Sequence, residues 1–280
     1  MNNPMQLKAR IKNVAEAKKV SPQLVLQNYM LERLLERISL SRYKDNFIIK
    51  GGLLISSMIG IDFRTTMDLD TTIKNQPLNE ESLKNLLSEI CAISADDGIS
   101  FTIDRIEPIR DDDEYGGYRA HLFANYNPMS VSVKVDVTTG DIITPQEVDF
   151  SYIPMFSDEP IPIKSYNLET LLAEKLETII SRSVLNTRQR DFYDIYILSK
   201  LFHEQIDFGL LSSAIAATAS KRNSTDAMEN SASILQTIES DEMMKARWNG
   251  YSREYSYTSN ISFSEAVAAA RELLIRVKNI

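Results

Sequence analysis

The sequence has few residues of the kinds that bind zinc or form disulfides. It contains one cysteine, Cys91, and two histidines, His121 and His203, among 280 residues. A single cysteine excludes an internal disulfide and favours a reducing cytoplasm. Because nitrogen and sulfur ligands are so scarce, any bound metal should be held by carboxylates.

Long apolar runs are also lacking. No stretch approaches the roughly 20 apolar residues that a membrane-spanning helix needs. Residues 1–20 are polar and basic, without the apolar core of a signal peptide. We therefore expect a cytoplasmic protein that has no membrane partner.

Acidic residues are in excess, but their distribution is uneven. The net charge of −8 argues against indiscriminate coating of nucleic acid, and we expect no DNA binding. Residues 1–50 nevertheless hold ten Lys or Arg and four Asp or Glu, a local balance of +6 that leaves −14 for the remainder. Two interpretations stay open: a solvated helix face, or a basic strip that attracts a polyanionic substrate toward an acidic centre.

Hydrophobic periodicity predicts a mixed N-terminal half and a helical C-terminal half. Residues 145–166 hold four of the nine prolines and are interpreted as an irregular connection. The fold class is therefore α+β, with a mixed sheet, flanking helices and a basic N-terminal helical segment in residues 1–165, then a helical domain in residues 166–280. Expected helices cover about 22–38, 79–93, 167–183, 190–202 and 264–277, and expected strands about 47–49, 67–73, 99–106, 118–126 and 131–137.

The first long helix, at 22–38, has an apolar stripe formed by its leucines. Its charged residues are expected mostly outside, in contact with water. These are Glu32, Arg33, Glu36 and Arg37.

An acidic pair gives the clearest chemical signal. Asp68 and Asp70 share one face of a predicted strand, about 7 Å apart, while Leu69 points into the core. Strands disfavour acidic residues, and two oxygen donors at this spacing suit Mg²⁺. Asp136, which follows Lys134 on the polar face of a later strand, is a candidate third carboxylate for a two-metal displacement. An exposed polar strand face is the alternative.

A glycine turn precedes this pair in the chain. Gly51 and Gly52 lie between a predicted strand and an apolar helical segment, where bare backbone N–H groups can approach a phosphate. An ordinary tight turn is the alternative. Arg64, Thr65 and Thr66 directly precede the acidic pair and are candidates to contact phosphate or to order the loop.

Charged residues also interrupt two apolar helix faces in the C-terminal half. Lys175 falls within a stripe of leucines and isoleucines, and Asp191 and Asp194 share a face with apolar residues of the next helix. One interpretation is an ion pair that locks the two helices. The other places Lys175 on a nucleotide triphosphate. Arg188 and Arg190 are candidates either to clamp phosphate or to pair with these acids.

Other conspicuous residues have a structural explanation. His121 alternates with apolar strand neighbours, and Cys91 is expected to be an inert core thiol. The acidic run at 111–114 stands beside two glycines and predicts a solvated hairpin loop. The basic and aromatic residues at 247–257 could stack on RNA, but packing onto the helical half is favoured.

With these motifs in this order, the sequence resembles the AbiEii/AbiGii toxin family of nucleotidyltransferases, the toxin half of type IV toxin–antitoxin and abortive-infection systems. The similarity covers about residues 7–203. The matching segments are NFIIKGGLL at 46–54, RTTMDLD at 64–70, EKL at 174–176 and RDFYDIY at 190–196.

The resemblance implies a core like that of DNA polymerase β and a helical C-terminal region. It further implies that Gly51 and Gly52 form the phosphate-binding turn, that Asp68 and Asp70 bind metal, that Lys175 binds the nucleotide, and that Asp191 is the final catalytic acid. The separately encoded antitoxin of such a system is not expected to form a stable complex with the toxin.

One departure from the wider superfamily concerns the Gly-Ser motif. Here Gly52 stands in place of the serine, and Leu53 follows it. Ser56, Ser57 and Thr65 are the candidates to supply the missing hydroxyl.

The expected reaction transfers a nucleoside monophosphate from an NTP, such as GTP or a pyrimidine NTP, with Mg²⁺ or Mn²⁺. The expected acceptor is the tRNA 3′ end, and the expected outcome is growth arrest during phage infection. Two alternatives stay open: an acceptor hydroxyl on a protein or small molecule, and a nucleotide-binding regulator without turnover. The basic segment favours tRNA, and the acidic pair argues against a mere regulator.

Overall fold

The computed structural model describes residues 3–109 and 116–279, so the acidic run at 111–114 lies outside the described residues. The chain divides into two compact units. The first comprises Met1–Asp141 and Glu147–Ser165, and the second comprises Ile142–Gln146 and Tyr166–Ile280. Within the described ranges, no helix is long and apolar enough to cross a membrane.

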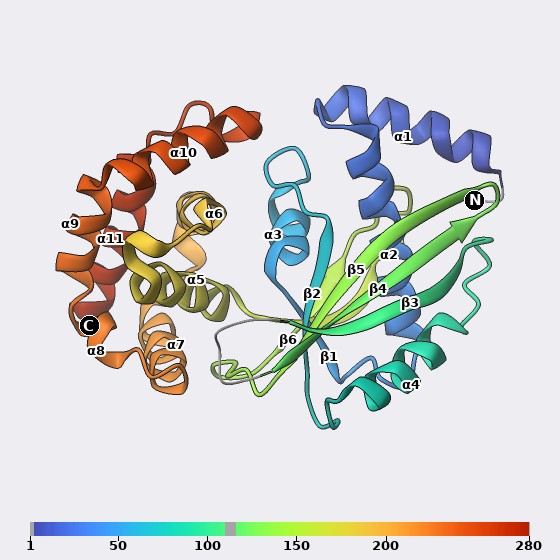
Figure 1. Cartoon of the computed structure of the whole chain (residues 1–280), viewed down its shortest axis with the longest axis horizontal. Helices are drawn as coiled ribbons and strands as arrows, with labels where there is room; N and C mark the ends of the chain where they lie inside the picture. The colour runs from blue at the N-terminus through green and yellow to red at the C-terminus, as the bar shows by residue number, and fades with distance from the viewer. Residues whose placement is uncertain (1–2, 110–115, 280) are drawn as a thin grey trace. The chain divides into compact units, whose positions relative to one another are not determined.

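A mixed sheet, seven-stranded over the described residues, forms the centre of the first unit (Figure 1). Across the sheet the order is β3-β4-β5-β2-β1-β7-β6. β2 pairs in parallel with β5 and antiparallel with β1, and β1 pairs in parallel with β7. The strands are β1 (Phe47–Lys50), β2 (Asp68–Ile73), β3 (Ser100–Ile109), β4 (Gly117–Tyr126), β5 (Met129–Thr139), β6 (Val148–Tyr152) and β7 (Ile161–Ser165).

The prediction of an irregular connection at residues 145–166 is wrong, because β6 and β7 form there. The prolines lie where few hydrogen bonds between strands are lost. Pro162 lies where β7 pairs with β6, and the registered pairs of β7 with β1 begin only at Lys164. A proline has no N–H to donate to a neighbouring strand, so it disrupts a central strand most. Pro162 pairs with β6, which is the edge strand of the sheet.

Helices α2 and α4 lie against the sheet of the first unit (Figure 1). α2 packs against β5 and β7, and α4 packs against β3. α3 packs against β1 and β2, the two strands that it connects. Ser21 caps α2 by accepting a hydrogen bond from the Leu24 N–H, as its position before Pro22 predicts. The helices of this unit are α1 (Pro4–Lys18), α2 (Pro22–Leu40), α3 (Gly51–Ile59) and α4 (Glu80–Cys91).

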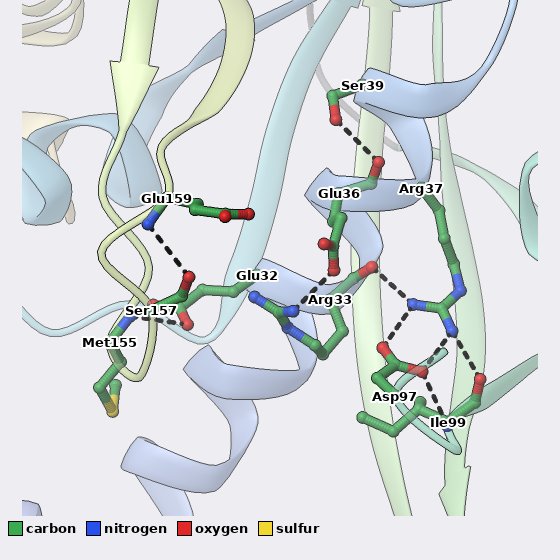
Figure 2. Close-up of polar contacts among 10 residues, drawn as sticks. All are labelled: Glu32, Arg33, Glu36, Arg37, Ser39, Asp97, Ile99, Met155, Ser157 and Glu159. Atoms are coloured by element: carbon green, nitrogen blue, oxygen red, sulfur yellow. Dashed lines mark hydrogen bonds and ion pairs between the residues drawn. The ribbon is translucent and has the colours of Figure 1, made fainter. Parts of the chain in front are cut away.

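The expectation that the charged residues of α2 lie mostly outside is wrong for Glu32 and Arg37, which are 3% and 1% exposed. The Arg37 guanidinium donates two hydrogen bonds to the Asp97 carboxylate at 2.8 and 2.9 Å and a third to the Ile99 carbonyl at 2.6 Å (Figure 2). A buried charge is tolerated when it is paired and hydrogen-bonded in this way. The pair ties α2 to the chain segment that leads into β3.

Glu32 ties the same helix to the segment that follows β6. Its carboxylate accepts hydrogen bonds from the Tyr152 hydroxyl and from the Met155 N–H, each at 3.1 Å. Desolvation by burial raises the pKa of Glu32 to about 7, although these hydrogen bonds and the charge of Arg33 oppose the shift.

The second unit is helical, as predicted. α5 packs against α6 and α7, and α11 packs against α6, α7 and α9. Asn167 caps α5 by accepting from the Thr170 N–H, and Thr144 joins the unit because its carbonyl accepts from the Asn167 amide. The helices are α5 (Leu168–Arg182), α6 (Gln189–Leu201), α7 (Phe208–Lys221), α8 (Thr225–Glu229), α9 (Ser231–Ser240), α10 (Glu242–Glu254) and α11 (Phe263–Lys278).

Glu32→Gln should change how stability depends on pH. The folded-state pKa of Glu32 lies above the unfolded value, so the folded protein holds an extra proton between about pH 4.5 and 7. The stability contributed by this residue therefore falls as pH rises through that window, by about 3 kcal/mol in total. Urea unfolding at pH 5 and pH 8 should show the variant gaining stability relative to wild type by roughly that amount. Glu36→Gln, one turn along α2, is the control, and parallel pH profiles for wild type and Glu32→Gln would contradict the assignment.

Candidate active site

The turn between β1 and α3 brings two glycine residues against Asp70. Gly51 has a φ of +64°, in the left-handed region that favours glycine. A Cβ on Gly51 would lie 2.2 Å from Asp70 Oδ2. The Gly52 N–H donates to the same oxygen at 3.2 Å. The Asp70 carboxylate is therefore seated on the glycine turn, and only a residue without a side chain permits that approach.

Thr66 and Arg64 occupy the space that a side chain on Gly52 would take. A Cβ there would lie 2.7 Å from Thr66 Oγ1 and 3.5 Å from Arg64 Nη2. Arg64 is 5% exposed and donates a hydrogen bond to the Thr65 carbonyl. The loop that precedes β2 thus places a hydroxyl and a guanidinium beside the backbone of the turn at Gly52.

The hydroxyl nearest to the Cβ position of Gly52 belongs to Thr66. The sequence left Ser56, Ser57 and Thr65 as the candidates. The Ser57 hydroxyl instead donates to a carbonyl within α3 at 2.7 Å, and Ser56 is buried. The sequence gives no signal for Thr66 over Thr65, because the choice depends on how the loop folds back over the turn.

Strand register places the acidic residues on one face of the sheet. In the parallel pair of β2 and β5, Asp68 is opposite Lys134 and Asp70 is opposite Asp136. Side chains on a strand alternate between the two faces, so these four share a face, while Leu69 is fully buried on the other. The predicted alternation of side chains along each strand is confirmed. The register places Asp68 and Asp70 of β2 beside Lys134 and Asp136 of β5.

Arg119 of β4 engages the third carboxylate. Its Nε donates to Asp136 Oδ1 and its Nη2 to Asp136 Oδ2, both at 2.7 Å. The described part of the chain contains no group of three or more His, Cys, Asp or Glu side chains arranged to hold a metal ion. Sequence reasoning missed Arg119, because only the pairing of β4 with β5 sets it opposite Asp136.

Asp68 has a buried oxygen, Oδ1, without a hydrogen-bond partner. Desolvation raises the pKa of Asp68; the charge of Lys134 opposes the rise, Asp70 and Asp136 add to it, and Arg119 opposes it. A divalent cation would provide the positive partner that this oxygen lacks, and carboxylate oxygens are the ligands that Mg²⁺ prefers. The donor set of Asp68 and Asp70 therefore fits a hard divalent ion.

The second unit holds the remaining predicted residues on two packed helices. Lys175 of α5 lies with its Nζ 2.9 Å from Asp191 Oδ1 and 2.6 Å from Asp194 Oδ2, both on α6. The three side chains are 12%, 8% and 0% exposed. The ion pair between the two helices, which was one of the two interpretations of the sequence, is thus present in the structure. Asp191 Oδ2 is nevertheless buried without a hydrogen-bond partner, and Arg190 is exposed at the start of α6.

The other conspicuous residues of the sequence have structural surroundings. His121 shares a 2.9 Å hydrogen bond with Glu107 of the neighbouring strand. Cys91 is half-buried, less than expected for a core residue, and desolvation raises its pKa to about 11, so the thiol is protonated at neutral pH. Trp248 is 2% exposed and donates to the Ile261 carbonyl at 3.1 Å, which confirms that the aromatic segment packs on the helical unit.

The first unit thus combines a mixed sheet with an acidic strand residue, Asp70, seated on a glycine turn, and the class of protein with which it agrees is the nucleotidyltransferases. Residues 33–269 match the family described as "Nucleotidyl transferase AbiEii toxin, Type IV TA system". The chain belongs to this family, whose type IV systems pair an NTP-using toxin with a separate antitoxin. Nucleotidyltransferases generally use divalent metal ions.

Two solved structures from Helicobacter pylori share the fold. One is of a candidate nucleotidyltransferase, 16% identical, with a TM-score of 0.52 over 93% of this chain and 98% of that chain. The other is of the protein JHP933, 15% identical, with a TM-score of 0.52 over 92% of this chain and 95% of that chain. No curated protein matches the chain.

Gly51→Ala should destabilise the first unit and displace Asp70. The added Cβ meets the Asp70 carboxylate, and the positive φ strains any L-residue, so we expect a loss of about 1–3 kcal/mol in unfolding free energy. Gly250→Ala is the matched control, because no atom apart from the adjoining backbone of α10 lies within 4 Å of that Cβ position. The control should be neutral or gain up to about 1 kcal/mol. Equal effects of the two substitutions would contradict the close approach at Gly51.

Lys175→Met should destabilise the second unit, because it leaves the Asp191 and Asp194 carboxylates buried without their cation. The expected loss is about 3–5 kcal/mol, measured by urea unfolding. Lys200→Met, at an exposed position of α6, is the control and should stay within about 0.5 kcal/mol of wild type. A Lys175→Met protein as stable as the control would show that the ion pair does not hold the two helices.

Proposed function

We propose that this chain transfers a nucleoside monophosphate from an NTP to an acceptor hydroxyl, and that the acceptor is the 3′ end of tRNA. The observation that carries the proposal is the seating of Asp70 on the Gly51–Gly52 turn, with Asp68 and its unpartnered oxygen on the same face of β2. Carboxylate oxygens suited to a metal thus lie against the glycine turn that we propose binds a phosphate.

Asp68 and Asp70 are the residues that would hold Mg²⁺ or Mn²⁺, and Asp136 would join them. A cation bound there supplies positive charge that offsets the triphosphate and favours attack by the acceptor hydroxyl. The Gly51–Gly52 turn binds phosphate oxygens through its backbone N–H groups, because glycine permits a close approach. The Gly52 N–H would exchange its hydrogen bond to Asp70 for one to the phosphate.

Side chains around the turn orient the triphosphate. Arg64, Thr65 and Thr66 lie in the loop before β2, where the guanidinium and the Thr66 hydroxyl border Gly52. Lys134, opposite Asp68 in the register, adds a further cation on the same face. A guanidinium matches phosphate geometry with two parallel donors, which fixes orientation as well as charge.

The second unit contributes further residues to the proposal. Lys175 is the nucleotide-binding lysine and Asp191 the final catalytic acid, with Asp194 and Arg190 in support. In the reaction, the acceptor oxygen forms a bond to the α-phosphorus and the bond from that phosphorus to the bridging oxygen breaks. Pyrophosphate leaves, and the hydroxyl proton passes to water.

Helix α1 supports a polyanionic acceptor. Leu7, Ile11 and Ala15 are buried at helical spacing, so the opposite face is open to water. A small substrate would gain little from so many cations, whereas a tRNA gains from each phosphate that is neutralised. The exposed cations of this segment are Lys8, Arg10, Lys12, Lys18 and Lys19.

The proposed cellular outcome follows from the acceptor. A tRNA with extra nucleotides at its 3′ end cannot be aminoacylated, so translation stops and growth arrests, which would limit a phage infection. The antitoxin of the family's type IV systems relieves the arrest without forming a stable complex with this chain.

The test incubates purified protein with each labelled NTP, Mg²⁺ and total tRNA, beside Asp68→Ala/Asp70→Ala. Label should enter tRNA with one preferred NTP, and the double variant should lose at least about 10³-fold in rate, as expected when transition-state charge loses its stabilisation. Asp158→Ala, an exposed carboxylate of the same unit, is the control and should keep full activity.

Each failure has its own meaning. Absence of label in tRNA with wild-type protein would overturn the acceptor, and label appearing instead in protein or a small molecule would identify the alternative. Label that persists in the double variant would overturn the site. Expression toxicity that survives the double substitution would point to a nucleotide-binding regulator without turnover.

A further inference from the structure

The guanidinium of Arg119 uses both oxygens of the Asp136 carboxylate. Its Nε and Nη2 donate to Oδ1 and Oδ2 at 2.7 Å each, so the two planar groups meet in a bidentate fork. This geometry leaves Asp136 poorly placed to share a cation. A metal that uses all three carboxylates of the face must therefore compete with Arg119.

The electrostatic surroundings of Arg119 extend beyond its partner. The hydrogen bonds to Asp136 raise the pKa of Arg119, and the charges of Asp136, Asp68 and Asp70 add to the effect. Arg119 and Lys134 are thus cations that act on Asp68 from neighbouring strands, where Asp68, Asp70 and Asp136 share one face of the sheet. Both charges lower the pKa of Asp68 and so offset part of the repulsion among the three carboxylates.

Arg119 is the more exposed partner of the pair. Its side chain is 36% exposed, whereas that of Asp136 is 15% exposed. The arginine side chain is long and flexible, while the aspartate is short and fixed by its strand. If a divalent cation took the carboxylate, the guanidinium would be the group to leave. A guanidinium released beside a nucleotide finds an equivalent bidentate partner in a phosphate.

We propose that Arg119 is an exchangeable placeholder, which occupies Asp136 in the metal-free protein and transfers to the triphosphate of the incoming NTP when the metal binds. This inference rests on the proposed nucleotidyltransfer and adds a residue that positions its substrate. Metal and nucleotide binding then depend on each other. The metal releases Arg119 for the triphosphate, and the triphosphate holds Arg119 away from Asp136, where it would compete with the metal.

The test measures binding instead of turnover, with Mn²⁺ followed by electron paramagnetic resonance and each NTP by calorimetry. In Arg119→Ala, Mn²⁺ alone should bind at least about fivefold more tightly, because its competitor is gone, and the NTP with Mn²⁺ should bind at least about fivefold more weakly. Arg119→Lys, which cannot form the fork, should show both effects in smaller measure. Thermal unfolding of each variant establishes that it folds.

Arg105→Ala is the matched control. Arg105 lies on neighbouring β3, opposite His121, and carries the same charge as Arg119. Its ion pairs are with Asp104 and Glu107 instead of Asp68, Asp70 or Asp136. It should change either affinity by less than about twofold, as a screened surface charge does. An equal gain in Mn²⁺ affinity in this variant would reduce the effect to general electrostatics and overturn the proposal.

The remaining outcomes separate this inference from the proposed function. Wild-type protein that binds neither Mn²⁺ nor any NTP would overturn the proposed function itself. Wild-type binding that is abolished by Asp68→Ala/Asp70→Ala but unchanged in both Arg119 variants would leave the function standing and overturn the placeholder. Weaker Mn²⁺ binding in Arg119→Ala would show that the arginine merely holds Asp136 in place, and would also overturn it.

Discussion

The parallel pairing of β2 with β5 is the constraint on which the candidate site depends. It sets Asp68 opposite Lys134 and Asp70 opposite Asp136, so acids from distant parts of the chain share one face. A shift of one residue would turn every side chain of β2 to the other face. That shift would expose Leu69 and bury the acids without partners. The hydrophobic core therefore fixes the register, and the register fixes the chemistry.

The same sheet is held from its other side by buried polar contacts of α2. Arg37 reaches Asp97, and Glu32 reaches the segment after β6, so one helix joins the two ends of the strand order. Buried ion pairs add little net stability, because desolvation offsets their attraction. They specify position, however, since a misplaced helix would leave a charge unpaired. Arg119 and Asp136 follow the same rule on the opposite, more exposed face, where the pairing can be exchanged.

Local patterns predicted much of the architecture, and the errors have physical causes. Ser21 and Pro22 marked the start of α2, and the alternation around Asp136 marked a strand, because capping and pleating depend only on neighbouring residues. The strands β6 and β7 were missed because prolines at 154, 160 and 162 hid their pattern. The burial of Glu32 and Arg37 was missed because helical periodicity places charges in water unless distant partners are known.

For the candidate site, the sequence by itself determined the Gly51–Gly52 turn, the common face of Asp68 and Asp70, and the charged intrusion of Lys175 into an apolar stripe. Each is a property of a short segment with one backbone geometry. Only the tertiary structure decided that Asp70 sits on the turn, that Thr66 borders Gly52, and that Arg119 holds Asp136. These contacts join residues brought together by strand pairing and loop closure, and such long-range choices leave no periodic trace in the chain.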